Sequence, residues 1–198
     1  MHIGLFGGSF DPPHICHTLF CVYVLEMTDV EKILWVPCAD HPFGKTAAAF
    51  EHRLAMSRLA AGLLAPRVEV SDIESALPRP SFTINTVEAL RHQRPGDRIS
   101  VLVGSDIVGE LDCWERIEEL RRLAEFVVVP RGGFAPEGTE TTVALPRLSS
   151  TEIRSALSQG RSVAGLLTPA VCEYIERHRL YVEGRGRKDE GSVLSPER

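Results

Sequence analysis

Residues 2–17 read HIGLFGGSFDPPHICH, an apolar run followed by a glycine-rich turn and two histidines. The run at 2–6 is short and ends at a glycine, as buried parallel strands often do. Gly8 has no Cβ, so a ligand could approach the backbone of the turn closely. Asp11 is expected to cap the helix that follows, with Pro12 at its first position. The stretch therefore predicts a strand, a ligand-binding turn and a helix in succession.

The two histidines of this stretch lie three residues apart. On a helix, His14 and His17 share one face of the first turn. Backbone N–H groups and the helix dipole favour anions at a helix N-terminus, and the imidazoles add further donors. A Rossmann dinucleotide fingerprint needs the pattern G-x-G-x-x-G, which this turn lacks. The stretch thus favours a phosphate site and argues against a dehydrogenase.

The alternation of apolar and amphipathic segments continues along the chain. Strands are predicted at 2–6, 32–36, 67–70, 99–103, 125–129 and 142–145, and helices at 14–27, 50–63, 83–93 and 114–123. Such alternation is typical of βαβ units, and we expect an α/β fold with a doubly wound parallel sheet. In such sheets ligands bind beyond the carboxyl ends of the strands, so the residues that follow strands are the candidates for function.

Composition and length limit the class of protein. The chain has 198 residues, a net charge of −5 and 43% hydrophobic residues, which argues against disorder and against a nucleic-acid partner. No run approaches the roughly 18 apolar residues of a membrane helix, and no signal peptide is visible, so we expect a cytoplasmic protein without a membrane partner. The five cysteines form no CxxC pair, which favours reduced thiols over disulfides or a zinc site.

The domain organisation is expected to be simple. Residues 1–182 are predicted to form a single domain, within which 148–182 is a small C-terminal helical part. Residues 183–198 are rich in charges and glycine and are expected to be a loose polar tail.

The C-terminal part contains two further predicted helices, at 149–160 and 169–179. Ser149 and Glu152 have the spacing of a capping box, and Thr168 is a candidate N-cap before a proline.

A second anion site is expected where the first of these helices begins. Ser149, Ser150 and Thr151 supply hydroxyls beside free backbone N–H groups, and Arg154 follows within the first turns. A helix N-terminus with an arginine suits a phosphate, although an ordinary capping box would use the same residues.

The segment ADHPFGKT at 39–46 fits a relaxed P-loop pattern between a strand and a helix. A P-loop cradles phosphate with backbone N–H groups, and Pro42 has none. A P-loop kinase or ATPase is therefore not expected. Lys45 stays a candidate phosphate ligand as a mobile point charge, with a solvated loop lysine as the alternative.

Several motifs together reveal a family resemblance. GGSFDPPHICH at 7–17 resembles the signature of the nucleotidyltransferase family with the (H/T)-x-G-H motif, and within it the bacterial nicotinate-nucleotide adenylyltransferases. Similar pieces follow in order: SFTINT at 81–86, GSD at 104–106, PRGG at 130–133, LSSTEIR at 148–154 and LLTPAVCEYIERHRLY at 166–181. The resemblance implies a Rossmann-like nucleotidyltransferase fold. It also implies transfer of the adenylyl group of ATP to nicotinate mononucleotide, giving deamido-NAD and pyrophosphate in NAD biosynthesis.

The resemblance further implies which residues act. Catalysis is expected from His14, His17, Lys45 and Arg154. Contacts to ATP are expected from Gly8, Ser9, Phe10, Gly104, Asp106, Ser149, Ser150 and Thr151. Contacts to the mononucleotide are expected from Thr83, Thr86, Trp114 and Arg131. No metal ligand is implied, because Mg²⁺ would be carried mainly by ATP; a homo-oligomer is a further expectation.

Alternatives at the residue level stay open. Trp114 could be a core aromatic at a helix start instead of stacking on the pyridine ring. Asp106 could form an Asx cap of a turn instead of binding a ribose, and Thr83 and Thr86 could be helix caps.

The chain departs from the family pattern at Cys16, which stands where the family has glycine. The usual S-Y-T-x-D-T is SFTINT here, and the usual P-P-H-K loop is HPFGK. If Cys16 is accessible, its position at a helix N-terminus should lower its pKa and the thiolate would repel ATP; otherwise it is neutral and packed away. Alternative functions are adenylyl or cytidylyl transfer to another phosphorylated acceptor, such as phosphopantetheine or a sugar phosphate, and nucleotide binding with impaired catalysis.

Overall fold

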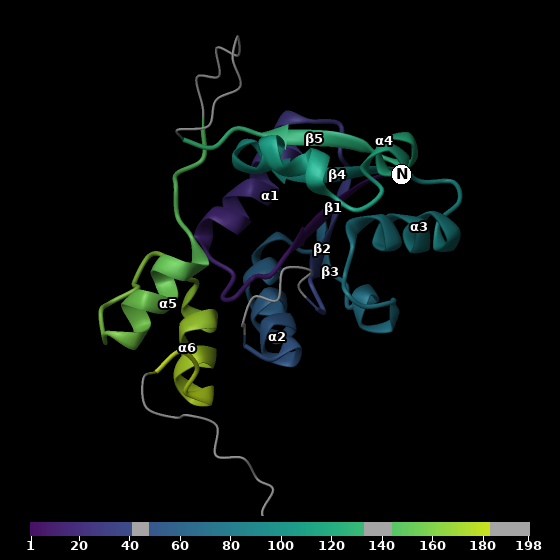
Figure 1. The fold of residues 1–198 in the computed structure, drawn as a ribbon. Helices are drawn as coiled ribbons and strands as arrows, with labels where there is room; N and C mark the ends of the chain where they lie inside the picture. Colours follow the sequence, from purple (N-terminus) through teal and green to yellow (C-terminus); the bar gives the residue numbers. More distant parts are fainter. Residues whose placement is uncertain (41–47, 133–143, 183–198) are drawn as a thin grey trace, which may run out of the picture.

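The computed structural model describes residues 1–40, 48–132 and 144–182. Five parallel strands form one sheet in the order β3-β2-β1-β4-β5 (Figure 1). The strands are β1 (His2–Gly8), β2 (Lys32–Pro37), β3 (Val68–Val70), β4 (Arg98–Gly104) and β5 (Glu125–Val129). The predicted α/β fold is confirmed, and the order reverses between β1 and β4, which places the ligand crevice at their carboxyl ends.

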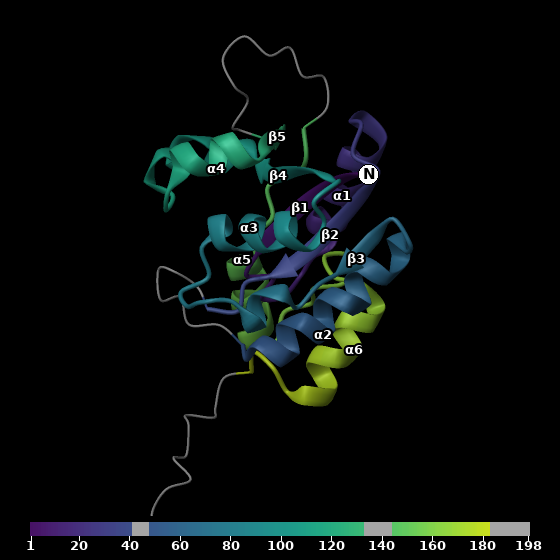
Figure 2. The ribbon, with the colours of Figure 1, turned by 90° about the vertical axis from the view of Figure 1, so that its right-hand side faces the viewer.

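Helices cover both faces of the sheet, as a doubly wound fold requires. They are α1 (Ile15–Met27), α2 (Phe50–Ala61), α3 (Thr83–Gln93), α4 (Ile117–Leu123), α5 (Ser150–Ser158) and α6 (Pro169–His178), with 3-10 turns at Gly62–Leu64, Ile73–Ala76 and Ser105–Cys113. Helices α1, α2, α5 and α6 share a hydrophobic core on one face, whereas α3 and α4 pack on the other (Figure 2).

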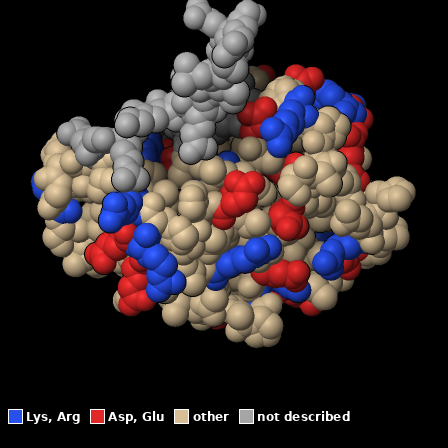
Figure 3. All heavy atoms as spheres, turned by 90° about the horizontal axis from the view of Figure 1, so that it is seen from below, with Lys and Arg blue, Asp and Glu red and all other residues tan. Residues whose placement is uncertain are grey.

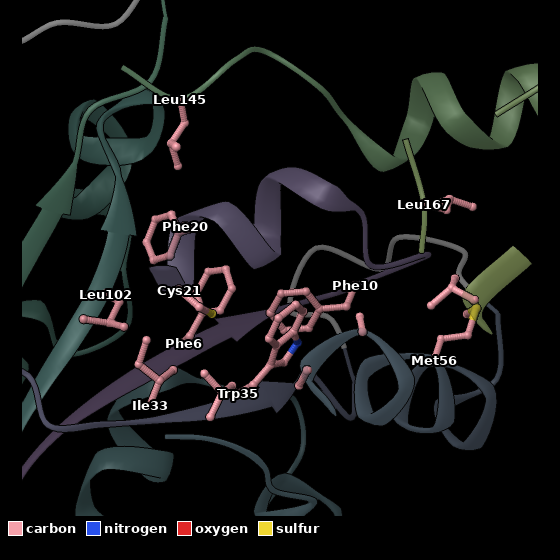
Figure 4. Packing of buried hydrophobic residues seen from close by; sticks show 14 of the residues in the cluster. Phe6, Phe10, Phe20, Cys21, Ile33, Trp35, Met56, Leu102, Leu145 and Leu167 are labelled. Atoms are coloured by element: carbon pink, nitrogen blue, oxygen red, sulfur yellow. The ribbon is translucent and has the colours of Figure 1, made fainter. Parts of the chain in front are cut away.

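The alternation of side chains along β1 explains both layers. Ile3 points to the face covered by α3 and α4, and Phe6 points to the opposite face. The ring of Phe6 stacks on Phe20 of α1 with centroids 4.4 Å apart (Figure 4). Phe10, from the turn after β1, packs on Trp35 of β2 at 4.8 Å. This buried aromatic cluster lies directly under the turn and supports it.

The C-terminal helical part packs on the same core as α1 and α2. Ile153 of α5 and Ile175 of α6 are buried in that cluster. The capping box predicted at the start of α5 is confirmed, because Ser149 Oγ accepts from the N–H of Glu152 and the Glu152 carboxylate accepts from the N–H of Ser149. The predicted N-cap of α6 is also present, since Thr168 accepts from the backbone within the first turn.

Two local predictions are wrong. Asp11 does not cap the first helix and Pro12 does not open it, because α1 begins only after His14, which is its N-cap. The carboxylate of Asp11 instead accepts a hydrogen bond from the segment before α2. The helix predicted at 114–123 begins only at Ile117, because a 3-10 turn occupies the chain through residue 113.

Some predictions concern residues beyond those that the structure describes. Lys45 and the tail at 183–198 lie outside them, as do the first two residues of the strand predicted at 142–145. In the described remainder of that range, Leu145 forms a single parallel bridge with Arg131.

Charges of both signs are interspersed over the described residues on the face seen in Figure 3, which shows no broad basic patch among them. Within the described ranges, no helix is both long and apolar enough to cross a membrane.

Candidate active site

The candidate site lies at the carboxyl ends of β1 and β4, where the strand order reverses. The turn at 8–14 follows β1, and the 3-10 turn Ser105–Cys113 follows β4. The N-terminus of α5 docks on the first of these turns, because Ser150 Oγ donates to the carbonyl of Pro12 at 2.9 Å. Three segments that are far apart in the sequence therefore meet at the edge expected for a nucleotide.

The turn after β1 is anchored from beneath by its own aromatic residue. Phe10 has a left-handed backbone with φ of 48°, and its side chain is 2% exposed. The ring lies 2.9 Å from where a Cβ on Gly8 would stand, which explains the glycine there. The carbonyl of Ser9 accepts a hydrogen bond from the Arg53 guanidinium at 2.9 Å. Any contact of Phe10 with ATP would come from its backbone, because its side chain faces the core.

His14 and His17 form the close pair that their spacing predicts, with ring centroids 3.6 Å apart. The backbone N–H of His14 donates to Nδ1 of His17 at 3.0 Å. Since Nδ1 of His17 is an acceptor, the proton of the neutral ring lies on Nε2. The start of α1 therefore presents an imidazole N–H donor in a fixed tautomer.

Both imidazoles are neutral at pH 7. The pKa of His14 is lowered to about 4, chiefly by burial and then by the positive charge of Arg131, against a raising effect of Glu152. Burial, then His14 and Arg131, lower the pKa of His17 well below its ordinary value. The pair therefore offers hydrogen bonds and not positive charge to an anion.

Arg131 supplies a positive charge that acts on both histidines, and it pairs with Asp106. The distance from Arg131 Nη1 to Asp106 Oδ2 is 2.7 Å. Arg131 also donates to the carbonyl of Leu148 at 3.1 Å, and its N–H donates to Ser105 Oγ at 2.9 Å. The Asp106 carboxylate folds over Gly104 so closely that a Cβ there would overlap it. A ribose hydroxyl would have to share this carboxylate with Arg131.

The N-terminus of α5 contributes one arginine and several occupied hydroxyls. Arg154 donates to the carbonyl of Asp11 at 2.7 Å and to Thr151 Oγ1 at 3.2 Å. Its side chain is 33% exposed, so the guanidinium remains open to a phosphate. The hydroxyls of Ser149 and Ser150 already donate within the protein. The backbone N–H of Ser149 is engaged by the Glu152 carboxylate, so a phosphate contact from these serines would come from the backbone N–H of Ser150.

The residues expected around the mononucleotide have different environments. Thr86 is 1% exposed and its hydroxyl donates to buried Glu74 at 3.1 Å, so it supports the site from behind. Thr83 opens α3 and is half-buried, and neither threonine caps that helix. Trp114 is half-buried, with its ring 6.3 Å from Phe126. Its stacking on a pyridine ring stays a prediction.

Sequence reasoning misses Arg53, a buried cation beneath the site. Its side chain is 5% exposed, and its guanidinium donates to the carbonyls of Ala48, Ser9 and Cys38 at 2.7–2.9 Å. The sequence does contain a sign that Arg53 is buried, because this residue stands three positions before Met56 on the apolar face of α2. A charged residue at a core position indicates a buried group with partners.

Thiol chemistry is not favoured at this site. Cys16 is 6% exposed, and burial raises the pKa of its thiol. A reactive thiolate would need access to solvent, which Cys16 lacks. Its thiol is therefore neutral and packed away, as one of the two alternatives expected, and no negative charge at this position repels ATP. In the described parts of the chain, no cluster of three or more His, Cys, Asp or Glu side chains could hold a metal ion.

A family model described as cytidylyltransferase-like matches residues 5–156. The chain belongs to the cytidylyltransferase-like family. The matched range of this family includes the turn after β1, the histidine pair and Arg154, all of which the structure brings to one edge of the sheet.

Individual relatives of this chain bear a name that is more specific than that of the family. The chain is 40% identical over 182 residues to the probable nicotinate-nucleotide adenylyltransferase of Anaeromyxobacter dehalogenans, an alignment that covers 90% of this chain and 96% of the relative. It is 38% identical over 186 residues to the protein of the same name from Thermus thermophilus, covering 91% of this chain and all of the relative, 100%. Within the cytidylyltransferase-like family, the similarity to this group extends over nearly the whole chain.

Solved structures share the fold. The Plasmodium falciparum nicotinic acid mononucleotide adenylyltransferase complexed with NaAD superposes with a TM-score of 0.77 at 21% identity, covering 91% of this chain and 97% of that chain. The same enzyme complexed with APC gives a TM-score of 0.74 at 20% identity, covering 91% of this chain and 96% of that chain. At this identity the likeness shows that the fold is shared.

Proposed function

We propose that this protein transfers the adenylyl group of ATP to nicotinate mononucleotide, giving deamido-NAD and pyrophosphate, as a step of NAD biosynthesis. Relatives that match nearly the whole chain bear the name of this activity, and the P. falciparum protein is complexed with NaAD. The observation that carries the proposal is the docking of α5, with Arg154, on the turn that leads to the histidine pair. Two phosphate-binding helix N-termini at one place suit a triphosphate.

The chemistry needs alignment more than acid–base catalysis. A phosphate oxygen of the mononucleotide forms a bond to the α-phosphorus of ATP, while the bond to the bridging oxygen breaks and its electron pair leaves with pyrophosphate. The attacking phosphate has a second pKa of about 6 and is mostly ionised at pH 7, so a general base is unnecessary. Histidines held neutral by burial fit a role as donors to the charge that develops on the leaving group.

Each cationic or donor residue has a separate part in this proposal. His17 donates its Nε2–H to a phosphate oxygen, because its Nδ1 is engaged by the N–H of His14. Arg154 brings a positive charge and a planar pair of donors to the same anion. Lys45, which lies outside the described residues, adds a mobile charge. Mg²⁺ would be carried by ATP, since it keeps several waters and needs few protein ligands, and it would neutralise further phosphate charge.

The acceptor would occupy the side of the site that follows β4. There we place the pyridine ring against Trp114, whereas Asp106, which Arg131 holds in position, would meet the ribose of ATP. A cytoplasmic location is supported by the five cysteines, all of which are free. Self-association into a homo-oligomer is part of the same proposal, and sedimentation of the purified protein tests it.

Pyrophosphate release with a panel of acceptors tests the function. The purified protein and MgATP are mixed with nicotinate mononucleotide, nicotinamide mononucleotide, phosphopantetheine or a sugar phosphate, and CTP replaces ATP in parallel. We expect the highest kcat/KM with nicotinate mononucleotide and ATP. A higher value with phosphopantetheine or a sugar phosphate would contradict the acceptor. Release with none of these pairs would favour a nucleotide-binding protein with impaired catalysis.

A further inference from the structure

Tyr181 follows the last helix and reaches back to the first turn of the chain. Its phenolic O–H donates to Asp11 Oδ1 at 2.7 Å across 170 positions of sequence. Its backbone is left-handed, with φ of 61°, which is uncommon for an aromatic residue. A backbone conformation of this kind persists only where the surroundings hold it, and the bond to Asp11 is a contact that does so.

Asp11 is the point at which several elements meet. The residue is 3% exposed, and its Oδ1 also accepts from the N–H of Ala48, just before α2, at 3.1 Å. On the other side, Arg154 Nη1 donates to the Asp11 carbonyl at 2.7 Å and lies 3.5 Å from Oδ2. One carboxylate oxygen therefore accepts two hydrogen bonds, while the other forms an ion pair with Arg154 at 3.5 Å, longer than the roughly 2.7–2.9 Å of a tight charge-assisted hydrogen bond.

In this arrangement the Asp11 carboxylate and the phosphates of ATP would compete for Arg154. A carboxylate with a freely rotating end would close on the guanidinium and form a tight ion pair. Such a pair would hold Arg154 on the turn and away from a triphosphate. The two donors on Oδ1, one from Tyr181 and one from Ala48, fix the carboxylate so that Oδ2 stays at its present distance.

We propose that Tyr181 is a positioning residue for ATP binding, which acts by holding the Asp11 carboxylate so that Arg154 stays available to the phosphates. The inference rests on the proposed function, because it assumes that Arg154 binds ATP. Burial and the neighbouring Asp11 raise the pKa of Tyr181, so the phenol keeps its proton and remains a donor at any working pH. The segment that follows α6 thereby contributes to the site without touching the nucleotide.

The test compares Tyr181→Phe with a matched control, Tyr174→Phe, in the helix that precedes Tyr181. Tyr174 also ties α6 to its surroundings through its hydroxyl, which meets His52 Nδ1 of α2 at 2.9 Å, but it has no bond to Asp11. Tyr181→Phe should raise the KM for ATP and the Kd of a non-hydrolysable ATP analogue about tenfold, as expected for one hydrogen bond to a charged group. The KM for nicotinate mononucleotide should stay within about twofold, and Tyr174→Phe should change neither constant.

The outcomes separate this inference from the proposed function. If Tyr181→Phe matches Tyr174→Phe in both ATP constants while the wild-type protein is active with nicotinate mononucleotide, the inference is wrong and the function stands. If the wild-type protein is inactive, the function fails, and the Kd of the ATP analogue still decides the role of Tyr181.

A second variant serves if Tyr181→Phe does not fold. Asp11→Asn keeps an oxygen that can accept from Tyr181 and Ala48 but removes the charge that attracts Arg154. The proposal predicts that Asp11→Asn binds the ATP analogue as tightly as the wild-type protein or more tightly. Binding weaker than wild type by tenfold or more would overturn the competition on which the proposal rests.

Discussion

The backbone N–H of His14 donates to Nδ1 of His17, and this contact determines which ring nitrogen can meet a phosphate. In the neutral ring the proton lies on Nε2. A side chain that supplies an N–H at the Nε2 position should therefore keep part of the function. One that reproduces only the Nδ1 acceptor should keep the helix start and lose the N–H donor that we propose for catalysis.

Substitutions of His17 test this assignment. His17→Ala should lower kcat/KM for pyrophosphate release about 100-fold, the usual effect of removing one preorganised donor. His17→Gln should restore part of the loss, because its amide nitrogen reaches the position of Nε2. His17→Asn should not, although its oxygen can still accept from the N–H of His14. Equal rescue by both amides, in proteins with wild-type circular dichroism, would show that the Nε2 donor is not what matters.

At the scale of single residues, the sequence predicts relative positions that helix geometry fixes. It fails where the packing of side chains decides the protonation state of a group. Spacing alone places His14 and His17 on one face of a helix, and the structure agrees. The state of Cys16 was not predictable, because the helix dipole and burial shift a thiol pKa in opposite directions. Only the packing shows that burial prevails there.

At the scale of elements, α2 is tied to the ends of β1 and β2 by Arg53, which donates to three backbone carbonyls. Arg53→Met should lower the free energy of unfolding by about 3 kcal/mol or more, because buried acceptors lose their donor. Arg58→Met is the control on the same helix: its side chain is 56% exposed and lies 3.6 Å from Asp72. That change should stay within about 0.5 kcal/mol. Urea denaturation measures both, and equal losses would contradict a structural role for the buried guanidinium.

The elements themselves were largely predictable. Strand β5 and helix α3 begin and end at the predicted residues, 125–129 and 83–93, because an apolar run between turn residues marks the strand and apolar residues at helical spacing mark the helix. Prediction fails at the turn before α1, where Asp11 and Pro12 have the local pattern of a helix start. The Asp11 carboxylate accepts from Ala48 and Tyr181 instead, so tertiary hydrogen bonds override the local cap preference.

At the scale of the whole molecule, the site depends on contacts between the two ends of the chain. Ser150 reaches Pro12 across 138 positions, and Tyr181 reaches Asp11 across 170. The N–H of Ile15, a donor in the first turn of α1, is likewise bonded to the carbonyl of Leu166 at 2.9 Å. No local pattern encodes such pairs, which is why sequence reasoning found the two helix starts that are candidates for phosphate binding but not the contacts that join them.

Burial of the histidine pair also makes the whole fold sensitive to acid. The pKa of His14 is about 4 in the folded chain against an ordinary 6.5, and that of His17 is lowered in the same direction. Above pH 6.5 both rings are neutral in the folded and unfolded chains, so they add no pH dependence. As the pH falls from 6.5 toward 4, the unfolded chain binds protons that the folded chain does not, and stability is lost. For His14 alone the loss is on the order of 3 kcal/mol.

Urea denaturation at a series of pH values between about 7 and 4.5 measures this loss in three proteins. The wild-type protein should lose more stability on acidification than His14→Gln, which has no imidazole to protonate at that position. His92→Gln removes an exposed histidine of α3 and should follow the wild type. Glu74, whose pKa is raised by burial, contributes with the opposite sign in all three proteins, so the difference between variants isolates the His14 contribution. If His14→Gln is as acid-sensitive as the wild type, the imidazole is not buried in its neutral form, and the donor role assigned to the pair loses its electrostatic basis.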